Sequence, residues 1–232
     1  MQIKAIKTRI FHENEDLFSF IFKYVKKIPE KSVLVVTSKV VSLAEGRTIE
    51  YKNKKQKVEL IKKESSLAIN TKLVWLTIKD GIVMADAGID ESNGDGQLIF
   101  LPKKSFFSAK KIRALLCAKY KVKNLGVIIS DSGLVPFRSG VIGLALGYAG
   151  FKGVKSYKGK KDIFGRKFIY QKVNVADSLA TAATLCMGEG NERQPLVLVK
   201  NAPVIFTAKT NKKEINFKKK EDIYAPLFNK IN

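Results

Sequence analysis

Two short runs of consecutive apolar residues constrain the fold of this chain most strongly. They cover residues 32–37 (Ser-Val-Leu-Val-Val-Thr) and 125–130 (Leu-Gly-Val-Ile-Ile-Ser), and polar residues bound each run. Apolar runs of this length with polar ends are typical of buried strands. The chain is therefore expected to have strands in its core. Ser38 directly follows the first run, and Asp131 directly follows the second.

Hairpin and helix signals decide the fold class. Asp80-Gly81 separates two apolar runs, a strong signal for a β-hairpin turn. Apolar residues recur at helical spacing in residues 15–27 and 106–120, and an Ala- and Leu-rich helix is expected over 175–187. The other expected elements are strands at 2–10, 73–78, 82–85, 167–170 and 195–200, a strand or a close-packed segment at 141–151, and a helix at 58–68. This mixture predicts an α+β fold with mixed or antiparallel sheets and flanking helices rather than a strictly alternating α/β fold.

Length and composition favour a globular chain. The 232 residues are 45% hydrophobic and 28% charged, a balance that allows a sizeable core in one domain over 1–232 or in two small lobes. No apolar run reaches the roughly 18 residues of a membrane-spanning helix, and the first residues lack signal-peptide features. With two cysteines and the single histidine His12, a His-rich metal site is excluded. We therefore expect a protein of the reducing cytoplasm.

The net charge of +22 raises the question of nucleic-acid binding. The sequence holds six arginines, so lysine carries nearly all the positive charge, whereas base recognition and phosphate forks favour arginine. The lysines are spread along the chain, without the interleaved aromatic residues of a stacking surface. We interpret them as a solvated surface whose field attracts anionic substrates. Nucleic-acid binding by this surface stays as the alternative.

An acidic loop over residues 84–96 is the first candidate site. Asp86, Asp90, Glu91 and Asp95 fall within ten positions and are interleaved with glycine, serine and asparagine. Short carboxylates on such a loop supply the oxygen ligands that hard divalent cations prefer, although the spacing is not that of an EF-hand. A polar turn between two strands explains these residues equally well.

A second candidate site follows the strand at 125–130. Asp131 emerges from this strand into a loop rich in glycine, proline and serine, and the loop carries Arg138. Carboxylates at strand ends are common in metal and phosphate sites, and an arginine there can neutralise a phosphoryl group or bind a carboxylate with two hydrogen bonds. The alternative is a capped turn with a structural ion pair.

Two shorter segments complete the candidate set. Ser38 and Lys39 follow the strand at 32–37 and are candidates for binding nucleotide phosphates, with an ordinary helix start as the alternative. Gly188 and Glu189 lie at a glycine-flanked helix end, for which a simple glycine C-cap is the favoured alternative. The sequence contains neither a P-loop motif nor a G-x-S-x-G elbow, which disfavours the enzyme classes that depend on them.

Taken in order along residues 30–200, these segments resemble the coenzyme F420-0:γ-glutamyl ligase family. The matching motifs are Ser42-x-Ala44-Glu45-Gly46-Arg47, Ala87-Gly88-Ile89-Asp90-x-Ser92-Asn93, Asp131-Ser132 with Pro136 and Arg138 beyond it, Tyr157-x-Gly159-x-x-Asp162-x-x-Gly165, Val175-Ala176-Asp177 and Met187-Gly188. Several spaced motifs in one order are far more specific than any single motif. The resemblance implies a two-lobed α+β protein that forms an intertwined homodimer.

The resemblance also implies an activity. It indicates a GTP-dependent amide ligase assisted by Mg²⁺ or Mn²⁺, in which the terminal carboxylate of an acceptor is phosphorylated to an acyl phosphate. The amine of L-glutamate then attacks this acyl phosphate. ATP in place of GTP stays open, and K⁺ is a further expected ion. Such chemistry needs cations around the transferring phosphoryl oxygens.

Residue by residue, the resemblance assigns roles to most of the candidates. Asp90, Asp131, Ser132 and Glu189 are the implied metal ligands. Asp90, Asp131 and Arg138 are the implied catalytic residues. The implied nucleotide contacts are Ser38, Lys39, Asn93, Gly188 and Glu189.

Two departures from the family pattern bear on the substrate. Leu43 stands where the family commonly has a lysine that contacts nucleotide, and residues 9–14 (Arg-Ile-Phe-His-Glu-Asn) lack the glycine and proline of the usual loop. These changes indicate a divergent, bacterial-type branch, some of whose members are thought to glutamylate folate. The acceptor therefore stays open between coenzyme F420-0 and a folate, as does the number of glutamates added.

Overall fold

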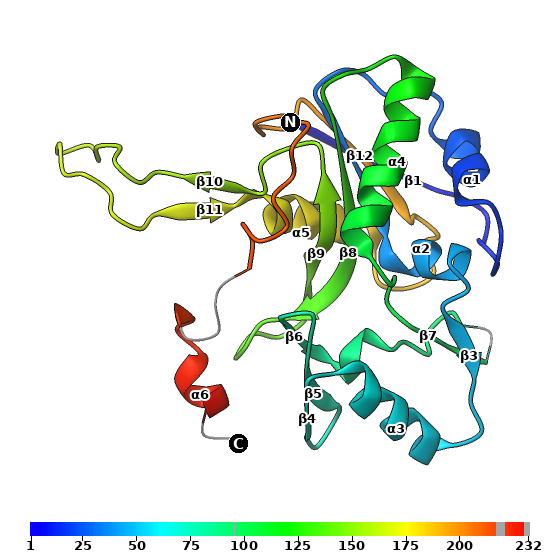
Figure 1. Ribbon diagram of the computed structural model, residues 1–232. Helices are drawn as coiled ribbons and strands as arrows, with labels where there is room; N and C mark the ends of the chain where they lie inside the picture. The colour runs from blue at the N-terminus through cyan, green and yellow to red at the C-terminus, as the bar shows by residue number, and fades with distance from the viewer. Residues whose placement is uncertain (95, 217–220, 230–232) are drawn as a thin grey trace.

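The computed structural model describes residues 1–94, 96–216 and 221–229, and a five-stranded sheet forms its centre (Figure 1). In spatial order its strands are β1 (Gln2–Ile6), β12 (Leu196–Lys200), β2 (Ser32–Thr37), β8 (Leu125–Leu134) and β9 (Val141–Ala149). β2 and β8 run parallel, and the other neighbouring strands run antiparallel. The two apolar runs of the sequence therefore lie side by side in the middle of the sheet.

Helices cover both faces of this sheet because its central strands are apolar on both sides (Figure 1). Leu34 and Val127 point into a core formed with α1, α2 and α4, whereas Val35 and Ile128 point into a second core against α5. The bounds of these helices are α1 (Leu17–Tyr24), α2 (Ser38–Ala44), α4 (Ser105–Tyr120) and α5 (Val175–Met187). The result is a body of three layers. None of the helices in the described part of the chain has the length and hydropathy that crossing a bilayer requires.

A smaller lobe is inserted between α2 and α4. Its elements are β3 (Thr48–Glu50), α3 (Lys54–Glu64), β4 (Leu67–Asn70), β5 (Trp75–Lys79), β6 (Ile82–Ala85), the short 3₁₀ turn η1 (Asp86–Gly88) and β7 (Gln97–Ile99). β4, β5 and β6 form an antiparallel sheet, β3 pairs with β7, and Ile61 and Leu98 lie in a small core of their own. The lobe carries the acidic loop, of which Asp95 lies outside the described residues. The expected α+β class, with mixed and antiparallel sheets and flanking helices, is confirmed.

A β-hairpin arm projects from the body (Figure 1). Strands β10 (Val154–Ser156) and β11 (Lys172–Asn174) form its base, and residues 157–171 form the outer part. Four large apolar side chains of this outer part are exposed, those of Ile163, Phe164, Ile169 and Tyr170. The short helix α6 (Ala225–Asn229) ends the described chain.

The strand predicted at 167–170 is wrong. This stretch makes one isolated bridge, between Lys161 and Lys167, and the strand β11 begins only at Lys172. The reason is an irregular pairing within the arm, in which Phe168 donates a hydrogen bond of 2.8 Å to the Lys160 carbonyl oxygen and accepts one of 2.9 Å from the Gly159 N–H. One residue therefore faces two on the opposite side, which interrupts the regular ladder of a strand.

Several other elements have shifted limits. The strand expected at 2–10 ends at Ile6. The helix expected at 58–68 spans Lys54–Glu64, because the Asn53 side chain caps its first turn. Strand β8 continues beyond the apolar run, across a bulge at residues 129–130, and pairs with β9 as far as Leu134. Asp131 therefore lies within a strand and not in the loop that follows one.

Candidate active site

The parallel pairing of β2 and β8 brings Asp131 next to Ser38. Thr37 pairs with Ser130, so the residues that follow them lie at the same edge of the sheet. There the Ser38 hydroxyl donates a hydrogen bond of 2.8 Å to the Asp131 carboxylate, across 93 positions of sequence. Ser38 also begins α2, so the junction of β2 with this helix and the outer half of β8 meet at one point.

Lys39, the next residue of α2, reaches the acidic loop of the smaller lobe. Its ammonium group lies 2.7 Å from the Asp90 carboxylate, and it donates hydrogen bonds to the Ser92 carbonyl oxygen at 2.8 Å and to the Ser92 hydroxyl at 3.1 Å. Ser92 in turn donates to the Asp90 carboxylate through its N–H at 2.6 Å and its hydroxyl at 2.9 Å. Consecutive residues of one helix therefore hold the two aspartates, Ser38 binding Asp131 and Lys39 binding Asp90.

The backbone of Asp90 is fixed by its pairing with Ile99. The two residues exchange both backbone hydrogen bonds, with N–O distances of 3.0 and 2.8 Å. Burial favours the protonated form of the Asp90 carboxyl, but the hydrogen bond and charge of Lys39 and the hydrogen bonds of Ser92 together hold the pKa of Asp90 below its usual range. Asp90 is therefore an anion at neutral pH, with its cationic partner already in place.

Asp131 lies in a different electrostatic environment. No lysine or arginine in the described part of the chain forms an ion pair with it. Burial raises the pKa of Asp131 to about 6, and the charge of Asp90 acts in the same direction, while hydrogen bonds from Ser38 and the Ser132 N–H oppose the shift. A cation placed beside Asp131 would offset this unfavourable burial of charge.

The two aspartates fit a divalent cation of the Mg²⁺ or Mn²⁺ kind. Such ions take oxygen ligands, and Mg²⁺ is usually held by one or two carboxylates together with substrate phosphates and water. Within the described ranges, no group of three or more His, Cys, Asp or Glu side chains could enclose a metal ion. The donor set therefore suits a cation shared with a phosphate-bearing substrate better than a closed structural site.

Comparison with known proteins places this chain in a family. The family model described as F420-0:Gamma-glutamyl ligase matches residues 5–201. The chain belongs to this family. It is similar to the coenzyme F420:L-glutamate ligases of Methanococcus maripaludis (strain C7), with 35% identity over 97% of both chains, and Archaeoglobus fulgidus, with 32% identity over 92% of both. The same-named protein of Methanocaldococcus jannaschii is 31% identical over 89% of this chain and 90% of its own.

In this member of the F420-0:γ-glutamyl ligase family, the Glu189 carboxylate is hydrogen-bonded to Ser132 and not to Asp90 or Asp131. The Ser132 hydroxyl donates a hydrogen bond of 2.7 Å to the Glu189 carboxylate, at the end of α5. Successive side chains of a strand point to opposite faces, so Ser132 and Asp131 face opposite sides of β8. Gly188 ends α5 at a φ of 77°, where a side chain would collide with Glu192, and this accounts for glycine as a C-cap.

Two further candidates of the ligase-family pattern have no side-chain hydrogen bond or ion pair to the aspartates among the contacts of the described residues. Arg138 stands in the exposed turn between β8 and β9. From Asp131 to the end of β8 the strand alone spans roughly 10 Å. Asn93 lies in the turn after Asp90, at a φ of 53°, and its side chain is exposed. The structure therefore brings Ser38, Lys39, Asp90 and Asp131 together through side-chain contacts, whereas Asn93 belongs to the same loop as Asp90 without such a contact and Arg138 stands beyond the end of β8.

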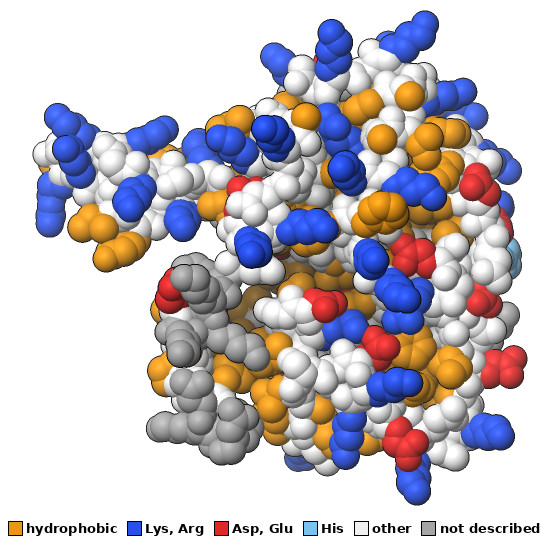
Figure 2. All heavy atoms as spheres, in the orientation of Figure 1, with side chains coloured by type: hydrophobic (Ala, Val, Ile, Leu, Met, Phe, Trp, Pro, Cys, Tyr) orange, Lys and Arg blue, Asp and Glu red, His pale blue; other side chains and the backbone are white. Residues whose placement is uncertain are grey.

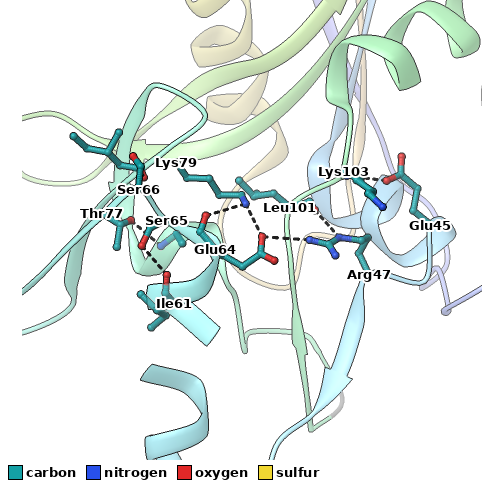
Figure 3. A network of polar contacts seen from close by, with 12 residues as sticks. Glu45, Arg47, Ile61, Glu64, Ser65, Ser66, Thr77, Lys79, Leu101 and Lys103 are labelled. Carbon is teal, nitrogen blue, oxygen red and sulfur yellow. Dashed lines mark hydrogen bonds and ion pairs between the residues drawn. The ribbon is translucent and has the colours of Figure 1, made fainter. Parts of the chain in front are cut away.

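The family motif residue Glu45 has a structural task, which Figure 3 shows. Its carboxylate accepts hydrogen bonds from the Lys103 N–H at 3.0 Å and from the Ser108 hydroxyl at 2.6 Å. Glu45 follows the last residue of α2, and Ser108 lies in the first turn of α4. These bonds fix the helix that carries Ser38 and Lys39 against the main body.

Arg47, from the same motif, ties this helix to the smaller lobe (Figure 3). It donates to the Leu101 carbonyl oxygen at 3.2 Å and lies 3.4 Å from the Glu64 carboxylate. Glu64 lies at the end of α3 and also binds the Lys79 ammonium of β5, at 2.5 Å. Sequence reasoning missed Glu64 and Lys79, because no local pattern marks partners that lie on separate elements.

Proposed function

We propose that this chain is a nucleotide-dependent γ-glutamyl ligase that joins L-glutamate to the terminal carboxylate of a coenzyme F420-0-type acceptor. The observation that carries the proposal is the pair of Asp90 and Asp131, held by consecutive residues of α2 in a member of this family. One carboxylate is paired with a cation and the other is not, which leaves a place for a divalent ion. We infer that Mg²⁺ or Mn²⁺, and GTP or ATP, act here.

The proposed reaction has two steps. A carboxylate oxygen of the acceptor attacks the terminal phosphorus of the nucleotide, and the bond to the nucleoside diphosphate breaks. The amine of L-glutamate then attacks the acyl carbon of the resulting acyl phosphate, releasing inorganic phosphate, and the amine loses a proton. Asp90 and Asp131 would hold the divalent cation, which would neutralise charge at the phosphoryl oxygens.

Residues of the chain contribute binding and orientation. Lys39 sits at the aspartate pair with an ammonium group that suits phosphate oxygens, and the Ser38 hydroxyl orients the Asp131 carboxylate. We further propose that Asn93, Gly188 and Glu189 contact the nucleotide and that Arg138 acts as a catalytic residue. K⁺ is a further proposed ion.

The names of the relatives favour a coenzyme F420-0-type acceptor. Each is named coenzyme F420:L-glutamate ligase, and the match covers nearly the whole of this chain. This supports a coenzyme F420-0-type acceptor over a folate, which stays as the second acceptor to test. Figure 2 shows lysine and arginine side chains spread over the whole visible face rather than gathered in one stripe, which supports the solvated-surface interpretation over nucleic-acid binding.

A product assay tests the proposed function. The protein is incubated with L-glutamate, Mn²⁺ or Mg²⁺, GTP or ATP, and either coenzyme F420-0 or a folate, and products are identified by mass spectrometry. We expect glutamylated coenzyme F420-0 only when nucleotide and metal are both present, and none with Asp131→Ala. Absence of product with both acceptors would refute the proposal, as would full activity of D131A.

We also propose that two copies assemble into a dimer, and the arm supports this. Ile163, Phe164 and Tyr170 at its outer part are more than four-fifths exposed, an unusual state for neighbouring large apolar side chains. A second copy that covers them would remove this surface from water. Light scattering should give the dimer mass for the wild-type protein and a monomer for Phe164→Ser combined with Ile163→Ser. A wild-type monomer would refute the dimer without touching the ligase activity.

A further inference from the structure

The turn that leads into Asp90 has an unusual backbone. Asp86, Ala87 and Gly88 all have positive φ angles, of 49°, 56° and 69°. Residues with side chains rarely adopt this region, and two of these three carry one. Backbone of this kind persists only when the surrounding structure fixes it. The contacts around the turn therefore decide whether it keeps its shape.

Thr77 of β5 makes the central contact. Its hydroxyl accepts a hydrogen bond of 2.8 Å from the Ala87 N–H and donates one of 2.7 Å to the Met84 carbonyl oxygen. Thr77 is 0% exposed and Ala87 1% exposed, so water does not reach this N–H in place of the hydroxyl. A buried N–H without a partner is costly, and the turn would have to change shape to satisfy it.

The side chain of Asp86 also holds this turn in place. One carboxylate oxygen accepts a hydrogen bond of 2.8 Å from the Trp75 N–H, and the other lies 3.5 Å from the Lys57 ammonium. The Asp86 carbonyl oxygen also accepts a hydrogen bond of 3.0 Å from the Ile89 N–H, which closes the turn. β5 therefore anchors the turn at two points, Trp75 and Thr77.

We propose that Thr77 is a positioning residue for the ligase reaction, whose buried hydroxyl holds the left-handed turn that sets the Asp90 carboxylate in the site. Only Gly88 and Ile89 stand between Ala87, which Thr77 holds, and Asp90. Asp90 is anchored on its other side by Ile99. Without the hydroxyl, the turn relaxes and the direction of the Asp90 carboxylate changes with it. This inference rests on the proposed function, because it takes Asp90 as a ligand of the divalent cation.

Mn²⁺ binding to the full chain in the presence of GTP, followed by electron paramagnetic resonance, tests the inference. Thr77→Val keeps the side-chain shape but removes the hydroxyl, and Thr77→Ser restores it. The matched control is Ser66→Ala, because Ser66 also donates to a backbone carbonyl oxygen of β5, that of Ile78, but does not touch the turn. We expect T77V to weaken Mn²⁺ binding by about tenfold, and T77S and S66A to stay within about twofold of the wild type.

The possible results separate the inference from the proposed function. If the wild type binds Mn²⁺ and T77V binds it as tightly, this inference is overturned and the proposed function stands. If the wild type binds no Mn²⁺ with GTP, both fail. Should T77V not fold, Thr77→Ala replaces it, because alanine also lacks the hydroxyl that binds the Ala87 N–H. T77A should bind Mn²⁺ more weakly than T77S, whereas equal binding by the two would overturn the inference.

Discussion

Replacing Asp131 with asparagine should stabilise the metal-free protein at neutral and alkaline pH. Asp131 is half-buried and forms no ion pair with a lysine or arginine of the described residues, and the loss of contact with water raises its pKa to about 6, above the usual value of 3.8. An asparagine has the same shape, carries no charge, and keeps an oxygen that can accept the hydrogen bond from Ser38. The substitution therefore removes an unfavourable buried charge, and with it a proposed metal ligand.

The sign and size of the effect follow from the two pKa values. A carboxyl group whose pKa is higher in the folded chain binds its proton more tightly in the folded chain than in the unfolded chain. The stabilisation by this proton is therefore complete below pH 3.8 and is lost as the pH rises through about 6. The difference of about two pH units corresponds to about 3 kcal/mol. D131N should thus match the wild type near pH 4 and exceed it by up to about 3 kcal/mol near pH 8.

Urea unfolding with a chelator present, followed by circular dichroism at several pH values, measures this difference. Asp90→Asn is the matched control. The pKa of Asp90 is lowered in the folded chain, because Lys39 and Ser92 together outweigh its burial, so its charge stabilises the fold and D90N should lose stability near pH 8. Adding Mn²⁺ and GTP should stabilise the wild type and leave D131N unchanged.

A pH-independent difference between D131N and the wild type would refute this reasoning. It would show that Asp131 is not the group whose charge is unfavourable in the folded chain. A loss of stability in D131N at every pH would show instead that the carboxylate makes favourable contacts that the asparagine lacks.

Three further predictions concern other residues. Lys39→Met should raise the pKa of Asp90 and weaken nucleotide binding, measured by NMR titration and a fluorescent GTP analogue; unchanged nucleotide affinity would contradict the role of Lys39. Gly88→Ala should lower the free energy of unfolding by about 1–3 kcal/mol, because an added Cβ would lie 2.6 Å from the Leu101 Cγ at a positive φ, and a midpoint in urea equal to that of the wild type would refute this. Glu64→Gln should lower the free energy of unfolding by about 1 kcal/mol, since it weakens contacts to two cations, and a smaller loss in high salt than in low salt would confirm their ionic nature.

The core strands could be predicted from the sequence because burial leaves a local mark. The run at residues 32–37 coincides with β2, and the helix at 175–187 coincides with α5, whose apolar residues recur at helical spacing. The outer half of β8 carries no such mark, because Asp131 and Ser132 belong to the strand only through their pairing with β9. Long-range pairing of this kind is invisible to local patterns.

The site could be predicted as a set of parts but not as an arrangement. Local sequence indicated Asp90, Asp131, Ser38 and Lys39 as separate hypotheses, and their meeting depends on the parallel pairing of β2 with β8. The position of Glu189 could not be predicted, because no pattern near residue 189 reveals that its carboxylate binds Ser132 on one face of β8.

Leu43 illustrates the same limit. Its position suggested a change in nucleotide contacts, whereas the structure shows its half-buried side chain packed against the core around α1, α2 and α4. The substitution of an apolar residue here therefore has a packing explanation that the sequence did not offer.

The wide separation of the contacts along the chain has a consequence for biosynthesis. The bond between Ser38 and Asp131 spans 93 positions, and the contact between Lys39 and Ser92 spans 53. A nascent chain that has left the ribosome only as far as β7 already contains Lys39 and Asp90, which form one half of the candidate site. It does not yet contain β8, the strand that pairs with β2 and carries Asp131. Closing such a long loop costs entropy that only the finished sheet offsets. A chain that stops before β8 therefore lacks Asp131 and cannot assemble the candidate site.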